Sequence, residues 1–417
     1  MTWDLSKLHA HNLTMQLGPR ATVEGLTALV NPKDVHIHRP TKHVFFQGRN
    51  ADASGDGHIH EFWWDGTGSP PHWQHNDVTI KTGAPLANAA PSSYMFMGGN
   101  GGKGTKHVMY EAGIVESEDH PVIELWWDGD WHANTNVAHN APLGIGGTPF
   151  GYEYSFFDPI SQRNIISQRV VYHTLNHRLH LLVRHASGDW QHTPLPSVPD
   201  VLSRPTAYAF TVHGQTVSGQ ASQRVLFTSP DGVEDIQHVR ELTWNEVGPN
   251  NQHWVLNDLT SQTGAPPLGS GDLPENMLMG LMHDLEFTLH VFYGRNQDQR
   301  LYELHFNELG WHVNDLTSIM AATPMVGGQP LAYVHVNQGT LNVQYVGIDG
   351  HIHALSRDVG QQWNPTNKQN LTMPIGAPPP LSQPVGFVFR DLTQHLFYIA
   401  NNSLNSHIGD IIELTDE

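Results

Sequence analysis

A tryptophan that returns at a nearly constant interval constrains the fold of this chain more than any other feature. The recurring residues, at intervals of 52 to 64 positions, are Trp73, Trp131, Trp190, Trp254, Trp311 and Trp363. From Trp363 through the C-terminus and round to Trp3 the interval is 57 residues, so the period closes on itself. Repeats of about this length indicate solenoids or propellers, and a period that closes favours a ring.

Within each copy, short β-branched and aromatic runs are separated by Gly, Asp, Asn and Pro. Such runs predict four antiparallel strands per copy. The 39 glycines and 28 prolines among 417 residues supply more turn chemistry than a helical protein needs. The sequence therefore predicts an all-β fold, a seven-bladed β-propeller of four-stranded antiparallel blades.

One domain spanning 1–417 holds the seven expected blades. They lie near residues 26–80, 92–137, 150–194, 206–260, 277–317, 331–372 and 385–417. The last of them supplies only three strands, and residues 1–14 are expected to provide its missing outer strand. Because an unpaired sheet edge promotes aggregation, pairing the two ends of the chain solves the edge problem of the ring.

Composition excludes several classes of partner. A formal charge of −19 argues against nucleic acid, since phosphate binding needs a basic face. No apolar run is long enough for membrane insertion, and the start MTWDLSKLHA lacks the apolar stretch of a signal peptide. We therefore expect a soluble protein, either cytoplasmic or secreted with its signal peptide absent from this numbering. The oligomeric state stays open.

Two histidine pairs have possible metal-binding geometry. His58 and His60, like His351 and His353, put two imidazoles on one strand face. The phrase GHIH belongs to the repeat, however, and no carboxylate recurs with it at ligand spacing. Cysteine is absent. The sequence thus predicts no metal and no organic cofactor. The recurring Asn-Asp pairs are expected to make hydrogen bonds at turns and strand ends.

The repeats GHIHEFWWDG at 57–66 and VIELWWDGDW at 122–131 resemble those of fungal and bacterial fucose-binding β-propeller lectins. The resemblance implies pockets between blades, each with an arginine, a glutamate and an aromatic ring. The glutamate persists as Glu61, Glu124, Glu241, Glu303 and Glu413. The position where the arginine is expected, after the aromatic of the second strand, holds Gln47, Glu111, His173, Thr228, Gly294, Val346 and Ile399. On this alignment the lectin pockets have lost their strongest donor.

Long connections gather over blades one to four, at 98–106, 158–169, 213–224, 66–71 and 246–253. This clustering favours one asymmetric site over seven equal ones. No known catalytic motif appears. The chain also resembles fungal natural-product cyclases of the hetero-Diels–Alder type. That implies a cofactor-independent pericyclase that performs a [4+2] cycloaddition on a small-molecule substrate. A glycan-binding lectin is the alternative, and a structural or protein-interaction propeller is the third.

One charge interrupts the apolar inner strands. Glu153, between Tyr152 and Tyr154, is the exception among their central positions. A buried carboxylate is costly unless it is bonded or protonated, so it is a candidate for function. The predicted catalytic residues are Glu153, His173 and His335. The predicted ligand-binding residues are Tyr152, Tyr154, Tyr208 and Arg390.

Overall fold

The structure, a computed structural model, describes most of the chain. The described residues are 3–32, 40–49, 55–66, 72–98, 104–113, 120–135, 137, 141–142, 148–158, 163–174, 176–185, 188–193, 195–203, 205–211, 221–232, 236–246, 252–269, 278–283, 288–326, 328–335, 338–389, 393–402 and 407–416.

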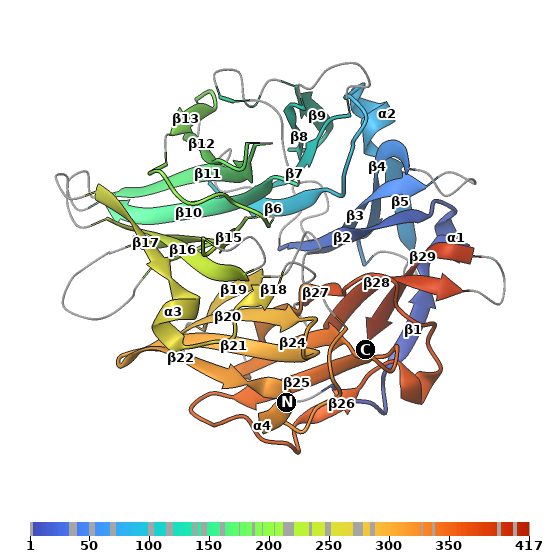
Figure 1. The fold of residues 1–417 in the computed structure, drawn as a ribbon. Helices are drawn as coiled ribbons and strands as arrows, with labels where there is room; N and C mark the ends of the chain where they lie inside the picture. The colour runs from blue at the N-terminus through green and yellow to red at the C-terminus, as the bar shows by residue number, and fades with distance from the viewer. Residues whose placement is uncertain are drawn as a thin grey trace.

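Seven antiparallel sheets stand around a common axis, which confirms the predicted seven-bladed propeller (Figure 1). The innermost strands are β2 (Ala21–Asn31), β6 (Ser92–Phe96), β10 (Phe150–Asp158), β14 (Thr206–Thr211), β19 (Leu278–His283), β23 (Leu331–His335) and β27 (Val385–Val388). The second strands are β3 (Thr41–Arg49), β7 (Thr105–Glu111), β11 (Arg163–His173), β15 (Ala221–Pro230), β20 (Thr288–Arg295), β24 (Thr340–Val346) and β28 (Gln394–Asn402).

The outer half of each blade repeats the same order. The third strands are β4 (Gly55–Trp64), β8 (Val122–Trp127), β12 (Leu179–His185), β16 (Ile236–Glu246), β21 (Arg300–Asn307), β25 (Ile352–Asp358) and β29 (His407–Thr415). The outermost strands are β5 (Trp73–Asp77), β9 (Trp131–Asn134), β13 (Gln191–Thr193), β17 (Gln252–Asp258), β22 (Gly310–Asp315), β26 (Lys368–Asn370) and β1 (His9–Asn12). A two-residue strand, β18 (Leu268–Gly269), adds to the fourth blade by pairing with β16.

The two ends of the chain complete one blade together, as the sequence predicted. Strand β1 pairs with β29, and His9 lies opposite Thr415 while Asn12 lies opposite Ile412. In Figure 1 the blue strand β1 runs beside the red strand β29. The strand ends at Asn12 because its side chain accepts a hydrogen bond from the backbone of Met15 and caps helix α1 (Leu13–Leu17).

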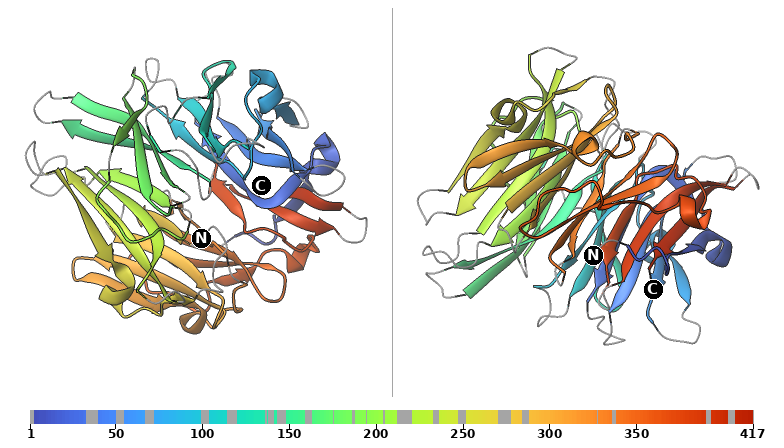
Figure 2. Two further views of the ribbon diagram at one scale, coloured as in Figure 1. Left: turned by 45° about the horizontal axis from the view of Figure 1, so that its top comes forward. Right: turned by 90° about the horizontal axis from the view of Figure 1, so that it is seen from below.

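The hydrophobic core is divided among the blade boundaries. Each of seven clusters draws its buried side chains from two neighbouring blades; Phe45 of the first blade, for example, packs with Tyr110 of the second. The cluster that joins the last blade to the first includes Phe397 and Phe46. The sheets stand face to face around the ring (Figure 2), so blade-to-blade packing holds the ring together.

The recurring Asn-Asp pairs end the outermost strands, as expected. The aspartate caps a one-turn helix: Asp77 caps α2 (Val78–Thr82), Asp258 caps α3 (Leu259–Thr263) and Asp315 caps α4 (Leu316–Ile319). Two residues later a threonine hydroxyl accepts from the backbone N–H of the third strand, as in Thr79 with Ile59 at 2.8 Å. The short motif thus fastens the outer edge of the blade. Among the described residues, no helix is both long and apolar enough to cross a membrane.

One predicted long connection is wrong. The segment 158–169 is mostly strand, because β10 continues to Asp158 and β11 begins at Arg163. The other predicted long connections fall largely outside the described residues, at 67–71, 99–103, 212–220 and 247–251.

Candidate functional site

A buried glutamate lies on the third strand of five blades. These residues, 0 to 3% exposed, are Glu61, Glu124, Glu241, Glu303 and Glu413. A carboxylate so far from water is stable only if hydrogen-bonding and charged partners replace the solvent. The candidate sites of this ring are therefore defined by what surrounds these five groups.

In four blades the first partner is a histidine on the second strand. The histidines are His43, His107, His290 and His395, each with Nδ1 2.7 to 2.9 Å from the glutamate Oε1. Their Nε2 atoms lie 2.6 to 2.9 Å from the hydroxyl of a threonine two residues earlier. A Thr-x-His sequence at the start of the second strand thus orients the imidazole toward the carboxylate.

The environment keeps the Glu303 carboxylate ionised. Burial by itself raises the pKa of Glu303, but hydrogen bonds from His290 and Asn314 outweigh it and lower the pKa to about 2. The Asn314 amide donates to Glu303 Oε2 at 2.7 Å. Asn76 does the same for Glu61. The asparagine of the Asn-Asp pair therefore donates a hydrogen bond to the buried carboxylate.

The neighbouring blade closes most of these positions. Between blades two and three, Arg184 donates to both oxygens of Glu124 at 2.6 and 2.9 Å, and the Trp190 indole donates at 3.0 Å. With His107, Glu124 takes part in four hydrogen bonds. Because a carboxylate offers about four acceptor sites, Glu124 has none left for a ligand.

Two further boundaries show the same use of the recurring tryptophan. The Trp363 indole donates to Glu303 at 2.8 Å, and the Trp73 indole donates to Glu413 at 3.1 Å. Each Trp thus links its own blade to the glutamate of the preceding one. This contact between blades accounts for the recurrence of the tryptophan along the chain.

The first boundary uses a buried lysine. Lys106 donates to Glu61 at 3.0 Å, and its Nζ lies 4.3 Å from the Trp127 ring centroid and 5.1 Å from that of Trp131. The ion pair and the aromatic rings together replace the hydration of the ammonium group.

The boundary between blades four and five differs. Here Arg224 occupies the position of the histidine, and its Nη1 lies 2.5 Å from Glu241 Oε1. The guanidinium carbon lies 5.8 and 6.0 Å from the ring centroids of Phe306 and Trp311. Within the described contacts, the Trp311 indole makes no hydrogen bond to Glu241. An arginine, a buried glutamate and two partly exposed rings therefore meet at this boundary.

This finding corrects the expectation that the pockets have lost their arginine. The sequence alignment searched near the end of the second strand, at positions such as Thr228, whereas Arg224 lies near its beginning. The signal was present: every second strand carries Thr or Ser two residues before this position, as in Ser222 before Arg224. Arg184 supplies a cation from the third strand of the following blade, and Lys106 supplies one from the second strand of the following blade.

Two blades lack the glutamate altogether. In blade three Leu181 takes its position, opposite Val171, and in blade six Ala354 takes it, opposite Gln344. The histidine position of blade three holds Arg169, opposite Tyr152. The boundary between blades three and four thus retains a cation after losing its carboxylate.

Glu153 lies at the boundary between blades two and three and is half-buried. Its carboxylate accepts hydrogen bonds from the backbone N–H groups of Met97 and Gly98. Burial raises the pKa of Glu153, and those two hydrogen bonds lower it only in part. The partners of this carboxylate are therefore backbone groups of blade two.

The structure places the predicted catalytic residues in two blades, with two of them at different levels of one blade. Glu153 lies opposite Gln168 of β11, whereas His173 is the last residue of that strand. Five residues of strand separate these levels by about 17 Å. His335 ends β23 in the sixth blade and is buried, as is His173. Glu153, His173 and His335 as one catalytic group remain a prediction.

The predicted ligand-binding tyrosines divide between two boundaries. Tyr152 and Tyr154 are buried in the cluster that joins blades three and four. Tyr208 is partly exposed and lies opposite Arg224, at the edge of the boundary between blades four and five. Arg390 lies outside the described residues.

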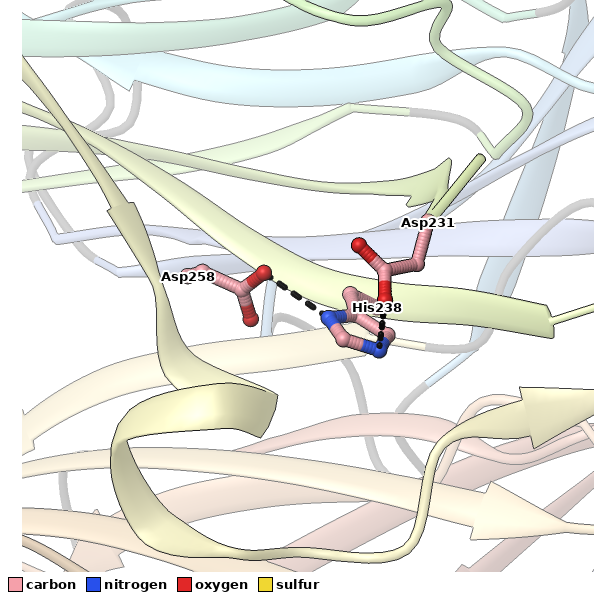
Figure 3. A group of neighbouring side chains, drawn as sticks. All are labelled: Asp231, His238 and Asp258. Carbon is pink, nitrogen blue, oxygen red and sulfur yellow. Dashed lines mark hydrogen bonds and ion pairs between the residues drawn. The ribbon is translucent and has the colours of Figure 1, made fainter. Parts of the chain in front are cut away.

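One trio of side chains could offer metal ligands within the part of the chain that the structure describes. In Figure 3, His238 stands between Asp231 and Asp258, with nitrogen-to-oxygen distances of 3.4 and 2.8 Å. Arg240 lies 3.7 and 3.4 Å from the same two carboxylates. His58 and Asp77 form the same pair in blade one, at 2.8 Å. A guanidinium already pairs with both acids, so the trio contributes to holding the outer edge of the blade.

Comparisons with known protein families and with curated proteins find no match. Among solved structures, AofleA from Arthrobotrys oligospora is 13% identical, with a TM-score of 0.47 over 87% of this chain and 89% of that one. The six-bladed fucose-recognising lectin of Aleuria aurantia is 12% identical, with a TM-score of 0.44 over 75% and 88%. BP39L lectin from Burkholderia pseudomallei is 12% identical, with a TM-score of 0.38 over 83% and 98%. Likenesses this distant carry no argument about function, which must come from the site itself.

Proposed function

We propose that this chain binds glycans at the boundary between blades four and five, through Arg224. The observation that supports it is the ion pair of Arg224 with Glu241 facing the rings of Phe306 and Trp311. Glu241 also accepts hydrogen bonds from Thr243 and Asn257, at 2.9 and 3.1 Å. The carboxylate is thus fixed on its own blade and orients the arginine.

This arrangement suits a sugar chemically. A guanidinium presents five N–H donors in a plane, and sugar hydroxyls are good acceptors for them. The apolar face of a pyranose packs on aromatic rings such as Trp311. Leu289 occupies the place that Lys106 holds in blade two, directly before the histidine position, so blade five contributes no charge there. Arginine, glutamate and ring are the set that the lectin resemblance implies.

The other boundaries support one dominant site instead of several equal ones. Glu124 is fully bonded by His107, Arg184 and Trp190. Lys106 is enclosed between Glu61 and two tryptophan rings. A sugar would have to break these contacts to enter. We therefore expect about one glycan to bind per protein chain.

A glycan array followed by isothermal titration tests the proposal. We expect binding by the wild-type chain and a roughly 10- to 100-fold loss of affinity in Arg224→Gln, the effect of losing charged hydrogen bonds. The matched control is Arg178→Gln, which alters an exposed arginine of blade three. No glycan bound, or affinity unchanged in Arg224→Gln with an unaltered melting temperature, rules the proposal out.

A second candidate, a cofactor-free cycloaddition on a small molecule, is favoured by Glu153. Its half-buried carboxyl has a raised pKa, so its protonated form is available nearer neutrality to donate a hydrogen bond to a substrate carbonyl. A thermal-shift screen with conjugated enones, repeated with Glu153→Gln, tests it. Stabilisation that needs the Glu153 carboxyl supports this candidate, and equal shifts in both proteins count against it.

A further inference from the structure

Among the residues that the structure describes, the boundary between blades three and four holds a buried cation without an acid. Arg169 is 8% exposed. In the described part of the chain its guanidinium contacts the Ser167 hydroxyl at 3.2 Å, the Tyr152 hydroxyl and the Tyr154 ring, whose centroid is 3.9 Å away. None of these groups carries a negative charge at neutral pH, because burial raises the pKa of Tyr152 to about 12.

Comparison with the next blade shows what is missing. Arg224 occupies the same position in blade four and is neutralised by Glu241, which lies opposite Leu226. The corresponding residue of blade three is Leu181, opposite Val171. The arginine has been kept while the side chain that would supply its carboxylate is a leucine.

Glu153 does not take over as counter-ion. It lies between Tyr152 and Tyr154 in β10, and successive side chains of a strand point to opposite faces. Its carboxylate meets the backbone of Met97 in blade two, on the side away from Arg169.

A second donor at the same boundary lacks an acceptor. Gln223 is fully buried, and its Oε1 accepts from the Tyr152 hydroxyl at 2.7 Å. Its Nε2 has no hydrogen-bond partner within the described part of the chain. Tyr152 therefore links Arg169 to Gln223 by hydrogen bonds. The two side chains at the ends of this series, Arg169 and Gln223, keep N–H groups to donate. At the preceding boundary the equivalent glutamine, Gln168, accepts from both Tyr94 and Arg184.

We propose that this boundary binds an oxyanion, in the first place the carboxylate of a small molecule, between Arg169 and Gln223. The ligand carboxylate would accept hydrogen bonds from both side chains and would supply the negative charge that Glu241 gives to Arg224 in blade four. Charge-assisted hydrogen bonds to a guanidinium are strongest when water is excluded, as it is here. The aromatic rings of Tyr152 and Tyr154 favour a ligand with an apolar body. This site is independent of the glycan proposal.

Calorimetric titration of the full chain with acetate, benzoate, sulfate and phosphate, at one ionic strength set with sodium chloride, tests the binding. We expect saturable binding of a carboxylate, and a roughly 10- to 100-fold loss in Arg169→Gln. Arg178→Gln, on the exposed side of the same blade, should bind as the wild type does. Sulfate or phosphate binding without carboxylate binding would assign the site to an inorganic oxyanion. Absence of any saturable binding overturns the proposal.

A second measurement needs no ligand. Leu181→Glu supplies the carboxylate from within, so it should melt at a higher temperature than the isosteric Leu181→Gln and should no longer bind the oxyanion. Arg169→Met should melt above the wild type in chloride buffer, because it removes an unpaired buried charge. If Leu181→Gln is as stable as Leu181→Glu, or Arg169→Met is less stable than the wild type, the arginine does not require an anion and the proposal fails.

Discussion

Two carboxylates meet at the boundary between blades two and three from opposite sides, and their surroundings give them opposite properties. Glu124 of blade two is fully buried, yet its pKa is lowered, because bonds to His107, Arg184 and Trp190 outweigh the burial that raises it. Glu153 of blade three is only half-buried, yet its pKa is raised, because burial outweighs two backbone hydrogen bonds. Depth alone therefore does not decide the charge of a carboxylate in this ring. The presence of a cation does.

The comparison also separates structure from function. Glu124 has all its acceptor capacity engaged and ties two blades together. Glu153 has no cation among its described partners, and its carboxyl is therefore protonated more readily. Replacing Glu124 should therefore lower the stability of the fold more than replacing Glu153 does. Replacing Glu153 should mainly affect the binding of a ligand at the inner strands.

The largest expected effect is that of Glu124→Gln. It removes the anion from the partly buried Arg184 and the charge from a fully buried site, so we expect a loss of about 3–5 kcal/mol in the free energy of unfolding. Chemical denaturation measures it, with the exposed Glu308→Gln as a control expected within about 0.5 kcal/mol. A loss below about 1 kcal/mol would show that the ion pair is not a tie between blades.

The next effect is the pH dependence of that loss. Because the pKa of Glu124 is lower folded than unfolded, its contribution is complete above the unfolded value near 4.5 and declines as pH falls through the folded value. The difference in stability between wild type and Glu124→Gln should therefore narrow below about pH 4.5. Denaturation series from pH 7 to pH 3 measure it. A difference that is constant over this range would contradict the assigned ionisation.

A smaller effect is expected from Thr105→Val. Its hydroxyl lies 2.7 Å from His107 Nε2 and orients the ring toward Glu124. Removing one such bond should cost about 1 kcal/mol, and Thr105→Ser should restore most of it. If serine is no better than valine, the hydroxyl does not orient the ring.

The smallest effect is that of Glu153→Gln, expected within about 0.5 kcal/mol at pH 5. Its sign with pH is opposite to that of Glu124. A carboxyl whose pKa is raised by folding contributes stability in acid and loses it as pH rises through the folded value. The variant should therefore gain on the wild type between pH 5 and pH 8. Parallel stability curves would mean that Glu153 is not perturbed.

The fold could be predicted from the sequence because its signals are periodic and redundant. The Trp interval, the turn residues and the wrap of the N-terminal segment all indicate the same ring. The site could not, because its decisive difference is a single residue in each blade. Arg224 and Arg169 lie where four of the other blades have histidine, and the repeat there is only Ser or Thr followed two residues later by a polar side chain.

The alignment of the second strands missed Arg224 because it compared only one position in each strand. A strand offers alternate positions to the same face, so a pocket residue can move along the strand and still reach the boundary. Arg184 donates to Glu124 from the third strand of the following blade, a position no within-blade alignment examines. Which side chains contact each other across two blades depends on how the two sheets are placed against each other. The sequence of a single repeat does not specify that placement.

The closing strand sets an order of events during synthesis. The Asn12 side chain of β1 donates a hydrogen bond to Asp410, 398 residues later, so the strand that completes the last blade is synthesised before the rest of the ring and pairs last. Until the final strands emerge from the ribosome, the N-terminal segment has no place to pair and the growing ring stays open. Joining segments so far apart in the chain is slow compared with forming a hairpin, so closure should be the late step of maturation. The interval before it is when the nascent protein most needs protection from its own edges.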